Sequence, residues 1–269
     1  MSQYQQTRLE MPRIPPGIRL LLLVNVGVFL VMAPLAESVR MFFGLSWHGL
    51  GEYFGLGVLR LLTYQFVHGL GVGHILFNML SLIVFGGMVE DLVGRTRMLR
   101  LYLCAGVAGG LLELLLRLVL GQDPTIIGAS GSCFGLMVYA ACRMPNVEII
   151  LILVRIQLWI VAALFSVIAL YNILVELAGK GGTGAADGGH LGGAIWGLLV
   201  WKFPGLDGWF ANLVQYARSW RTHRARQAAA ERAASLDEVL AKVKREGLSS
   251  LSARERKVLE RTSEEMRRH

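Results

Sequence analysis

Charge is scarce in this sequence, and so is cysteine. Only 17% of the 269 residues are charged, against roughly 25% in a typical soluble domain, while 54% are hydrophobic and the mean hydropathy is +0.50. The cysteines are odd in number and all lie in apolar segments, at Cys104, Cys133 and Cys142, which argues against a disulfide framework. The composition therefore excludes an ordinary soluble domain and indicates a membrane protein.

The first apolar segment lacks a small-residue cleavage site at its end. Residues 18–35 run directly into a long connection, so we interpret the segment as a retained membrane span and not as a signal peptide. The basic parts of the chain also lack a motif that reads nucleic-acid bases. Because lipid headgroups explain their charge, no nucleic-acid partner is expected.

Six apolar segments can cross a bilayer, which takes roughly 20 residues per helix and fewer within a bundle. They are residues 18–35, 74–92, 98–120, 130–143, 156–177 and 190–203. The connection 36–73 is expected to fold partly in the outer membrane interface, and residues 145–154 to be extended or re-entrant. The sequence thus predicts an all-α polytopic membrane protein.

Positive charge determines the predicted orientation of these spans. Arginines precede the first span, follow the second, flank the connection between the fourth and fifth, and follow the sixth. Because short cytoplasmic loops carry an excess of Lys and Arg, both termini are predicted to be cytoplasmic. The expected location, a separate prediction, is the cell membrane, as a multi-pass protein of a bacterial inner membrane. Spans two, four and six then begin on the outer side, so His74, Ser130 and His190, which open them, reach one depth.

Ser130 and His190 are the candidate nucleophile and base. Each lies beside a stripe of small residues with a four-residue spacing. Ser130 precedes Gly131 and Gly135 of span four, and His190 is embedded among Gly189, Gly193 and Gly197 of span six. Such stripes let membrane helices approach closely, as a short serine side chain needs in order to reach a histidine on another helix. The alternative is helix packing without chemistry, but an ionisable residue inside a membrane favours a functional site.

His74 and Asn78 are four residues apart, so they share one face of span two. One interpretation is a hydrogen bond between helices. The functional interpretation is a pair of donors to an oxyanion, joined by the backbone N–H of Ser130.

The order of these motifs resembles that of the rhomboid intramembrane serine proteases. The resemblance covers roughly residues 18–204, and its motifs are Leu62–His68, His74–Met79, Gly86–Glu90, Gly128–Gly131 with Phe134 and Gly135, and His190 with Gly193 and Gly197.

The resemblance implies a six-helix rhomboid-like bundle in which Ser130 is the nucleophile and His190 the general base, with no acidic third member. It further implies that His74 and Asn78 form the oxyanion hole and that Phe134 packs against the His190 ring. Many relatives carry a Trp-Arg pair in the first loop, where this chain has Leu59 and Arg60.

The expected activity is cleavage of other transmembrane proteins near the outer membrane face, with no metal and no cofactor. Substrates with helix-weakening residues are expected, because a peptide bond inside a helix is shielded by the hydrogen-bond ladder. The rival function is a non-catalytic rhomboid-like protein that binds or escorts membrane proteins. Such relatives typically lack the serine or the histidine, and this chain has both.

Other ionisable residues in or beside the spans receive structural interpretations. Glu113 and Arg117 are spaced for an intrahelical ion pair, and Glu90 is expected to tether loops. His68 could line the substrate entrance or lie in the interface, and the sequence does not decide between the two.

The domain boundaries follow from composition. Residues 1–17 are predicted to be a cytoplasmic segment, 18–204 the membrane domain, 205–230 a basic juxtamembrane segment on anionic lipid headgroups, and 231–269 a cytoplasmic helical hairpin. The hairpin is inferred from capping boxes at Ser235/Glu238 and Ser252/Glu255, with Gly247 between the helices. It resembles a C-terminal segment of some bacterial rhomboid-like proteins, and its partner is unknown.

Overall fold

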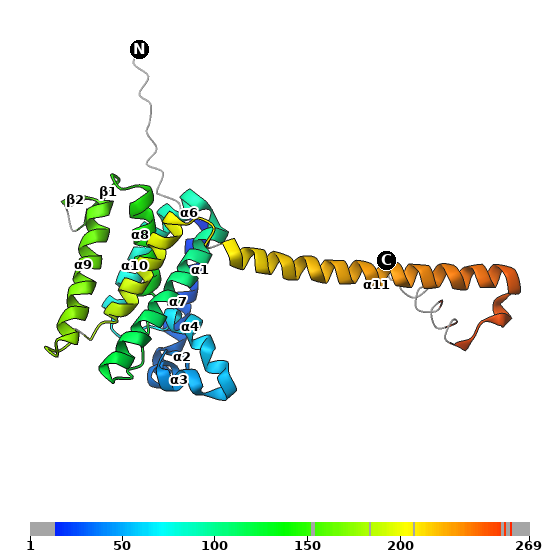
Figure 1. Ribbon diagram of the computed structural model, residues 1–269, viewed down its shortest axis with the longest axis horizontal. Helices are drawn as coiled ribbons and strands as arrows, with labels where there is room; N and C mark the ends of the chain where they lie inside the picture. The colour runs from blue at the N-terminus through cyan, green and yellow to red at the C-terminus, as the bar shows by residue number, and fades with distance from the viewer. Residues whose placement is uncertain are drawn as a thin grey trace, which may run out of the picture. The chain divides into compact units, whose positions relative to one another are not determined.

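The computed structural model describes residues 14–151, 154–182, 184–206, 208–253, 256 and 259. The chain divides into two compact units, residues 1–207 and residues 208–269. The first unit is helical apart from one short hairpin, and the second consists mainly of one long helix (Figure 1).

The first unit contains ten α-helices in its described residues. They are α1 (Pro16–Met32), α2 (Ala36–Phe43), α3 (Trp47–Gly51), α4 (Arg60–Thr63), α5 (Val72–Ser81), α6 (Gly87–Val93), α7 (Arg95–Leu120), α8 (Ser130–Arg143), α9 (Leu158–Leu177) and α10 (Asp187–Lys202). Short 3-10 segments cover Ala33–Leu35, Tyr53–Leu59 and Tyr64–Phe66, and a π-helical turn, Leu82–Gly86, joins α5 to α6. The prediction of an all-α polytopic membrane fold is confirmed.

Three helical stretches of the described chain are long and apolar enough to cross a membrane on their own: Val72–Val93, Arg95–Leu120 and Leu158–Leu177. The other predicted spans correspond to shorter helices, namely α1 with 17 residues, α8 with 14 and α10 with 16. Helix α9 exposes most of its apolar side chains, with 22% of its most apolar window buried. An apolar surface of this extent is typical of contact with lipid.

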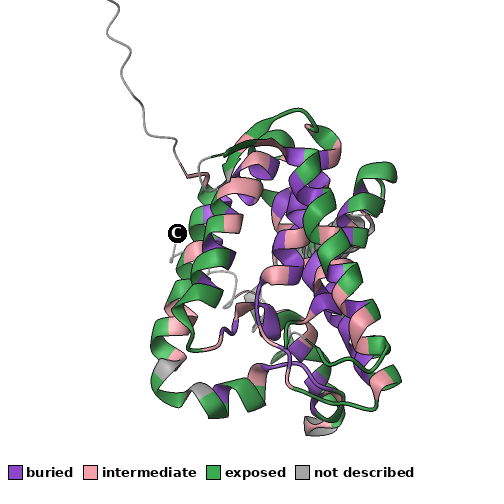
Figure 2. Cartoon of the chain, turned by 90° about the vertical axis from the view of Figure 1, so that its left-hand side faces the viewer, coloured by how far each residue is buried: buried purple, intermediate pink, exposed green. Residues whose placement is uncertain are grey.

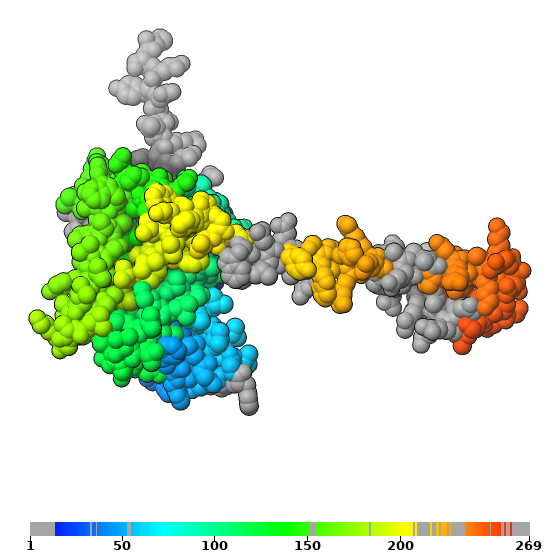
Figure 3. Space-filling view, viewed as in Figure 1, coloured from blue at the N-terminus to red at the C-terminus, as the bar shows by residue number. Residues whose placement is uncertain are grey.

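The central packing joins α7, α8 and α10, with α10 also packed against α9. In Figure 3 the yellow surface of α10 lies beside the green surfaces of its neighbours. Buried residues gather where these helices face one another, and exposed residues cover their outward faces (Figure 2). Leu101, Tyr102 and Leu136 are among the large side chains buried there. The site described below lies at one end of this central packing.

Glu90, in the first turn of α6, fixes the start of the first helix. Its carboxylate accepts hydrogen bonds from the backbone N–H groups of Gly17 (2.7 Å) and Ile18 (2.9 Å). These donors have no intrahelical partner, and a carboxylate at a helix N-terminus is electrostatically favourable. Glu90 therefore caps α1, a more specific role than the tethering of loops that we expected.

The extended segment between α8 and α9 is a two-stranded antiparallel hairpin. Strand β1 (Glu148–Leu151) pairs with β2 (Val154–Gln157), with Glu148 opposite Gln157. Of the two predicted conformations for residues 145–154, the extended one is found. The fifth span accordingly begins at Leu158, two residues later than predicted, because Ile156 and Gln157 belong to β2.

The second unit corrects one prediction. Helix α11 runs without interruption from Gly208 to Glu246, so no new helix begins at Ser235. The sequence between residues 226 and 234 is rich in Ala and Arg, which favour helix, and contains no Gly or Pro that would end it. The helix ends at Gly247, as predicted, in a left-handed conformation (φ 82°) followed by the 3-10 segment Leu248–Ser250. Glu255 of the second capping box lies outside the described residues.

Candidate active site

Ser130 is the first residue of α8, and the backbone before it is held in place from two sides. Ile126 pairs with Leu45 in an isolated bridge, and the Gly128 N–H donates to the Tyr64 carbonyl (3.0 Å). Gly128 has φ +119°, which side-chain-bearing residues rarely adopt, and a Cβ there would lie 2.8 Å from His74 Nε2. Glycine at this position therefore lets the backbone turn into α8 directly beside the His74 ring.

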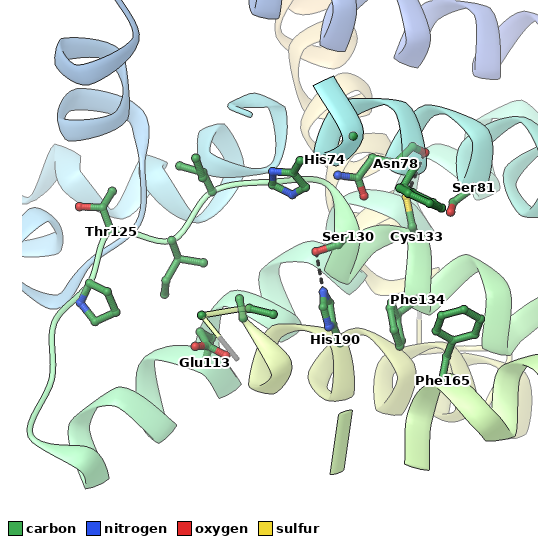
Figure 4. Close-up of a pocket in the computed structure, with 18 of the residues that line it drawn as sticks. His74, Asn78, Ser81, Glu113, Thr125, Ser130, Cys133, Phe134, Phe165 and His190 are labelled. Carbon is green, nitrogen blue, oxygen red and sulfur yellow. Dashed lines mark hydrogen bonds between the residues drawn. The ribbon is translucent and has the colours of Figure 1, made fainter. Parts of the chain in front are cut away.

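His190 lies in the first turn of α10, which begins at Asp187. Its Nε2 is 2.9 Å from Ser130 Oγ, within hydrogen-bond distance (Figure 4). The two residues are 60 positions apart in sequence and come from neighbouring helices. The structure thus brings together the serine and histidine singled out from the sequence, in the contact that a nucleophile and its base require.

The close approach of α8 and α10 depends on glycine. A Cβ added to Gly193 would lie 1.9 Å from the Gly131 carbonyl oxygen, and one on Gly197 would lie 2.3 Å from that of Gly135. A Cβ on Gly135 would lie 2.3 Å from the Cβ of Ala105 on α7. The two helices therefore touch backbone to backbone, a distance that no larger residue permits.

A third stripe of small residues lies on α7, and it was not predicted from the sequence. A Cβ on Gly109 would lie 2.5 Å from the Gly189 carbonyl oxygen, and one on Gly192 would lie 2.9 Å from the Gly109 Cα. The signal was present, because Ala105, Gly106, Gly109 and Gly110 are spaced to fall on one face of the third predicted span. Helix α10 is thus packed closely against two neighbours.

Phe134 lies one turn after Ser130 and covers the face of the His190 ring. The two ring centroids are 4.5 Å apart and the ring planes differ by 5°. Phe165 of α9 meets Phe134 edge-on at 6.2 Å (Figure 4). This stack restrains the plane of the imidazole while leaving both of its nitrogens free to form hydrogen bonds in that plane.

His74 and Asn78 project from α5 toward the start of α8 (Figure 4). Asn78 is buried, and its amide nitrogen has no hydrogen-bond partner among the described residues. A buried polar group left unpaired costs free energy, so an unpartnered donor beside a candidate nucleophile indicates that an acceptor binds there. His74 Nε2 and Asn78 Nδ2 are 2.8 Å and 3.9 Å from the Cβ position of Gly128, so both donors lie near the start of α8.

His68 lies in the connection before α5 and is buried rather than exposed at an interface. Its ring centroid is 5.2 Å from that of His74. Burial, and secondly the neighbouring His74, lower the pKa of His68 to about 4, so the ring is neutral at pH 7.

A cavity of about 820 Å³ opens beside these groups. Ser130, His190, His74 and Asn78 line it, together with apolar side chains such as Phe77, Phe85, Phe134, Met137 and Phe165. A mainly apolar cavity with a few polar groups directed at one point is typical of a ligand-binding or catalytic site. Within the described ranges, no cluster of three or more His, Cys, Asp or Glu side chains forms that could hold a metal ion.

A buried ionic network ties three helices together next to His190. The predicted pair within α7 is confirmed, with Glu113 accepting from Arg117 Nε at 2.6 Å. Arg117 also binds Glu176 of α9 (2.5 Å), and the other oxygen of Glu113 accepts from the Gly189 backbone N–H (2.9 Å). Glu176 was not anticipated, because a partner on another helix has no fixed sequence spacing.

One further acidic side chain reaches His190 itself. Asp187 Oδ1 is 3.5 Å from His190 Nδ1, and the Asp187 residue is 5% exposed. Asn172 of α9 donates a hydrogen bond to the same oxygen (3.3 Å). Sequence reasoning passed over Asp187, although its position three residues before His190 places the two on one helix face.

Arg60 is buried and forms an ion pair with Glu52, whereas Leu59 beside it is 56% exposed. The arginine of the first-loop pair is therefore an internal anchor of that loop, and the position that holds tryptophan in many relatives points outward.

Apolar helices of membrane-spanning length and a Ser–His pair beside a cavity between them define a polytopic membrane protein with a hydrolase-like site. The Rhomboid domain family matches residues 56–203, more than half of the chain, so this protein belongs to the Rhomboid family. The resemblance stated from the sequence motifs is confirmed. A second match, over residues 223–265, is to a family of unknown function, DUF6576.

Individual relatives agree with this assignment. The chain is 29% identical over 151 residues to the rhomboid protease GlpG of Haemophilus influenzae, covering 53% of this chain and 69% of that protein. It is 29% identical over 129 residues to the putative rhomboid protease YdcA of Bacillus subtilis, covering 46% and 60%. It is 40% identical over 77 residues to RHOMBOID-like protein 2 of Arabidopsis thaliana, covering 29% and 23%. The matched region is thus less than a quarter of that plant protein.

Proposed function

We propose that this protein is an intramembrane serine endopeptidase that cleaves transmembrane segments of other membrane proteins near the outer membrane face. The observation that supports it most directly is the 2.9 Å contact between His190 Nε2 and Ser130 Oγ at the wall of the cavity. The relatives named rhomboid protease support the same reaction class.

In the first step, Ser130 Oγ attacks the scissile carbonyl and His190 Nε2 takes the hydroxyl proton. The carbonyl oxygen becomes an oxyanion, which accepts hydrogen bonds from Asn78, His74 and the Ser130 backbone N–H. His190 then gives its proton to the leaving amine as the C–N bond breaks, and the acyl group stays on Ser130. Water, deprotonated by His190, hydrolyses this ester and restores both residues.

The oxyanion role is supported by the state of the donors. The Asn78 amide nitrogen is buried and has no partner within the described ranges, and the Ser130 N–H is among the first N–H groups of α8, which have no intrahelical partner. The positive end of the helix macrodipole adds to the same effect. An anion at this point gains hydrogen bonds that are otherwise unmade.

Substrate and orientation follow from the same chemistry. Hydrolysis consumes water, which the hydrocarbon core lacks, so the cavity must be reached from an aqueous face; we place it on the outer side, with both termini cytoplasmic. A substrate helix must unwind locally to present a carbonyl, so segments with Gly or Pro are the preferred substrates. Gly131, Gly135, Gly193 and Gly197 support the site by permitting helix contact, and Phe134 supports it by stacking on His190.

The test is cleavage of a single-span substrate by the full-length protein in proteoliposomes. Ser130→Ala and His190→Ala should each abolish turnover, because a nucleophile and its base act as a unit. Ser166→Ala on α9, which removes only a hydroxyl bonded to the Ala162 carbonyl, is the matched control and should cleave as the wild type does. Turnover that survives Ser130→Ala would refute the proposal, and a wild type that binds the substrate without cleaving it would indicate the escort function.

A further inference from the structure

We propose that Asp187 is a positioning residue for His190, which holds the imidazole in the tautomer that a base requires and stabilises its protonated form. The inference rests on the peptidase function proposed above and adds a third member to the Ser130–His190 pair.

The geometry places one partner at each nitrogen of the imidazole. Nε2 is 2.9 Å from Ser130 Oγ, and Nδ1 is 3.5 Å from Asp187 Oδ1. The Phe134 ring covers a face of the imidazole, parallel to it at 4.5 Å. The two polar contacts therefore restrain rotation of the imidazole within its own plane, and the stacked Phe134 ring restrains tilting out of that plane.

The chemistry requires that Nδ1 carry a proton when Nε2 acts as the base. Neutral imidazole holds one N–H, and Nε2 can accept the Ser130 proton only in the Nδ1–H tautomer. An ionised carboxylate accepts hydrogen bonds and donates none, so Asp187 favours that tautomer. When Nε2 is protonated, the same carboxylate faces an imidazolium cation and stabilises it. The proton moves from Ser130 to His190 and then to the leaving amine, and Asp187 stays ionised throughout.

Asp187 is itself held in position, as this role requires. It is almost fully buried, Asn172 donates to its Oδ1 at 3.3 Å, and it lies at the positive N-terminal end of α10. Glu113, the carboxylate among the residues that line the cavity, has one oxygen on Arg117 and the other on the Gly189 backbone N–H. Of the other ionisable groups that line the cavity, His74 lies on the opposite side of Ser130 from His190 (Figure 4), and Arg117 is bound to Glu113 and Glu176. Asp187 is thus the carboxylate directed at the ring.

A structural role for Asp187 makes a different prediction. A carboxylate in the first turn of a helix stabilises that helix, and its loss would lower the melting temperature without changing the chemistry of the folded enzyme. A positioning role instead lowers kcat at equal folded fraction and leaves KM unchanged, because the contact strengthens as the imidazole becomes charged.

The experiment compares Asp187→Asn, Asp187→Ala and Asp187→Glu in the full-length protein in proteoliposomes. We measure kcat and KM on the single-span substrate and the second-order rate at which a fluorophosphonate labels Ser130 with loss of fluoride. Asp187→Asn and Asp187→Ala should lower kcat and the labelling rate in parallel by roughly 10- to 10²-fold. This is less than the ~10⁴-fold effect of an orienting aspartate at full hydrogen-bond distance. Asp187→Glu, which keeps the charge on a longer side chain, should recover part of the loss.

Asp123→Asn is the matched control, since Asp123 is likewise a carboxylate that accepts hydrogen bonds, here from the backbone N–H groups of Trp47 and His48, but is not among the residues that line the cavity. It should alter the melting temperature and leave kcat unchanged. The inference is overturned if Asp187→Ala keeps kcat and labelling within twofold of the wild type, or if Asp187→Glu is as slow as Asp187→Ala. Failure of the proposed function is a separate outcome, in which the wild type and Ser130→Ala behave alike in both assays.

Discussion

Three residues near Ser130 each contribute to the reaction proposed for it. His190, the proposed base, lies 2.9 Å away, and Gly128 lets the backbone pass His74 without a clash. The Asn78 amide nitrogen has no partner in the part of the chain that the structure describes. The sequence could predict that Ser130, His190, His74 and Asn78 meet at one cavity, because membrane helices rarely bury such side chains without a reason. It could not predict the conformation of Gly128, because that depends on how α5 meets the start of α8. The Asp187 contact was overlooked, although the three-residue spacing within α10 indicated it.

Asn78→Ala provides a test at this scale. We expect kcat to fall on the order of 10²-fold, the effect of losing one oxyanion donor, because the wild-type amide is aimed at charge that exists only during reaction. The melting temperature should stay the same or rise, since the substitution removes a buried, unpaired N–H group. Turnover on a single-span substrate and thermal unfolding of the same preparation measure both quantities.

Asn146→Ala is the control for that variant, because Asn146 is exposed in the turn before β1. It should change neither quantity. If Asn78→Ala lost stability while retaining kcat, Asn78 would be a packing residue and the oxyanion hole would have to be formed by His74 and backbone alone.

At the scale of elements, the apolar segments predicted the helices and the glycine stripes predicted which of them touch. The fourth span was predicted at residues 130–143 and α8 covers Ser130–Arg143, since a glycine-rich turn begins it and Arg143 ends the apolar run. The pairing of β1 with β2 and the Arg117–Glu176 pair could not be predicted, because both are contacts between segments with no common periodicity. The error at Ser235 arose because a capping box also occurs within helices, where the i−4 carbonyls already satisfy the backbone donors.

Gly193→Val tests the contact between α8 and α10. A Cβ there would lie 1.9 Å from the Gly131 carbonyl oxygen, so the helices must move apart. We expect destabilisation of about 1–3 kcal/mol, as overpacking typically produces. Activity should fall further, by roughly 10²-fold, because a displacement of about 1 Å between reacting groups has an effect of that size. Unfolding in denaturant and turnover of the folded fraction separate the two.

Gly27→Val in α1 is the matched substitution, because a Cβ at Gly27 would meet nothing within 4 Å. It should keep wild-type turnover. Full activity in Gly193→Val would contradict the close-approach argument even if Ser130 and His190 are the catalytic residues.

At the scale of the whole molecule, the site residues and the tail occupy different parts of the chain. Ser130, His190, His74, Asn78 and Asp187 all belong to the unit that ends at residue 207. The tail unit has a different character: Tyr216 and Trp220 are exposed on α11, and Arg224 lies 4.2 Å above the Trp220 ring. Basic and aromatic side chains together suit the anionic headgroup region of a bilayer, and we propose that α11 binds there.

Truncation tests this separation. The boundary predicted from the sequence, between residues 230 and 231, is not where the chain should be cut. A cut at residue 230 would fall inside α11, so the informative ends are residue 246, where α11 stops, and residue 207, where the first unit stops.

Both shortened chains should cleave a single-span substrate in detergent at close to the full-length rate, because the proposed catalytic groups lie within residues 1–207. In vesicles with anionic lipid, the 1–207 chain alone should melt at a lower temperature than the full-length protein, because only this chain lacks the basic and aromatic residues of α11. The same comparison in neutral vesicles is the control and should show little difference. Loss of cleavage by the 1–246 chain in detergent would make the segment after Gly247 part of the enzyme and would contradict its interpretation as a separate appendage.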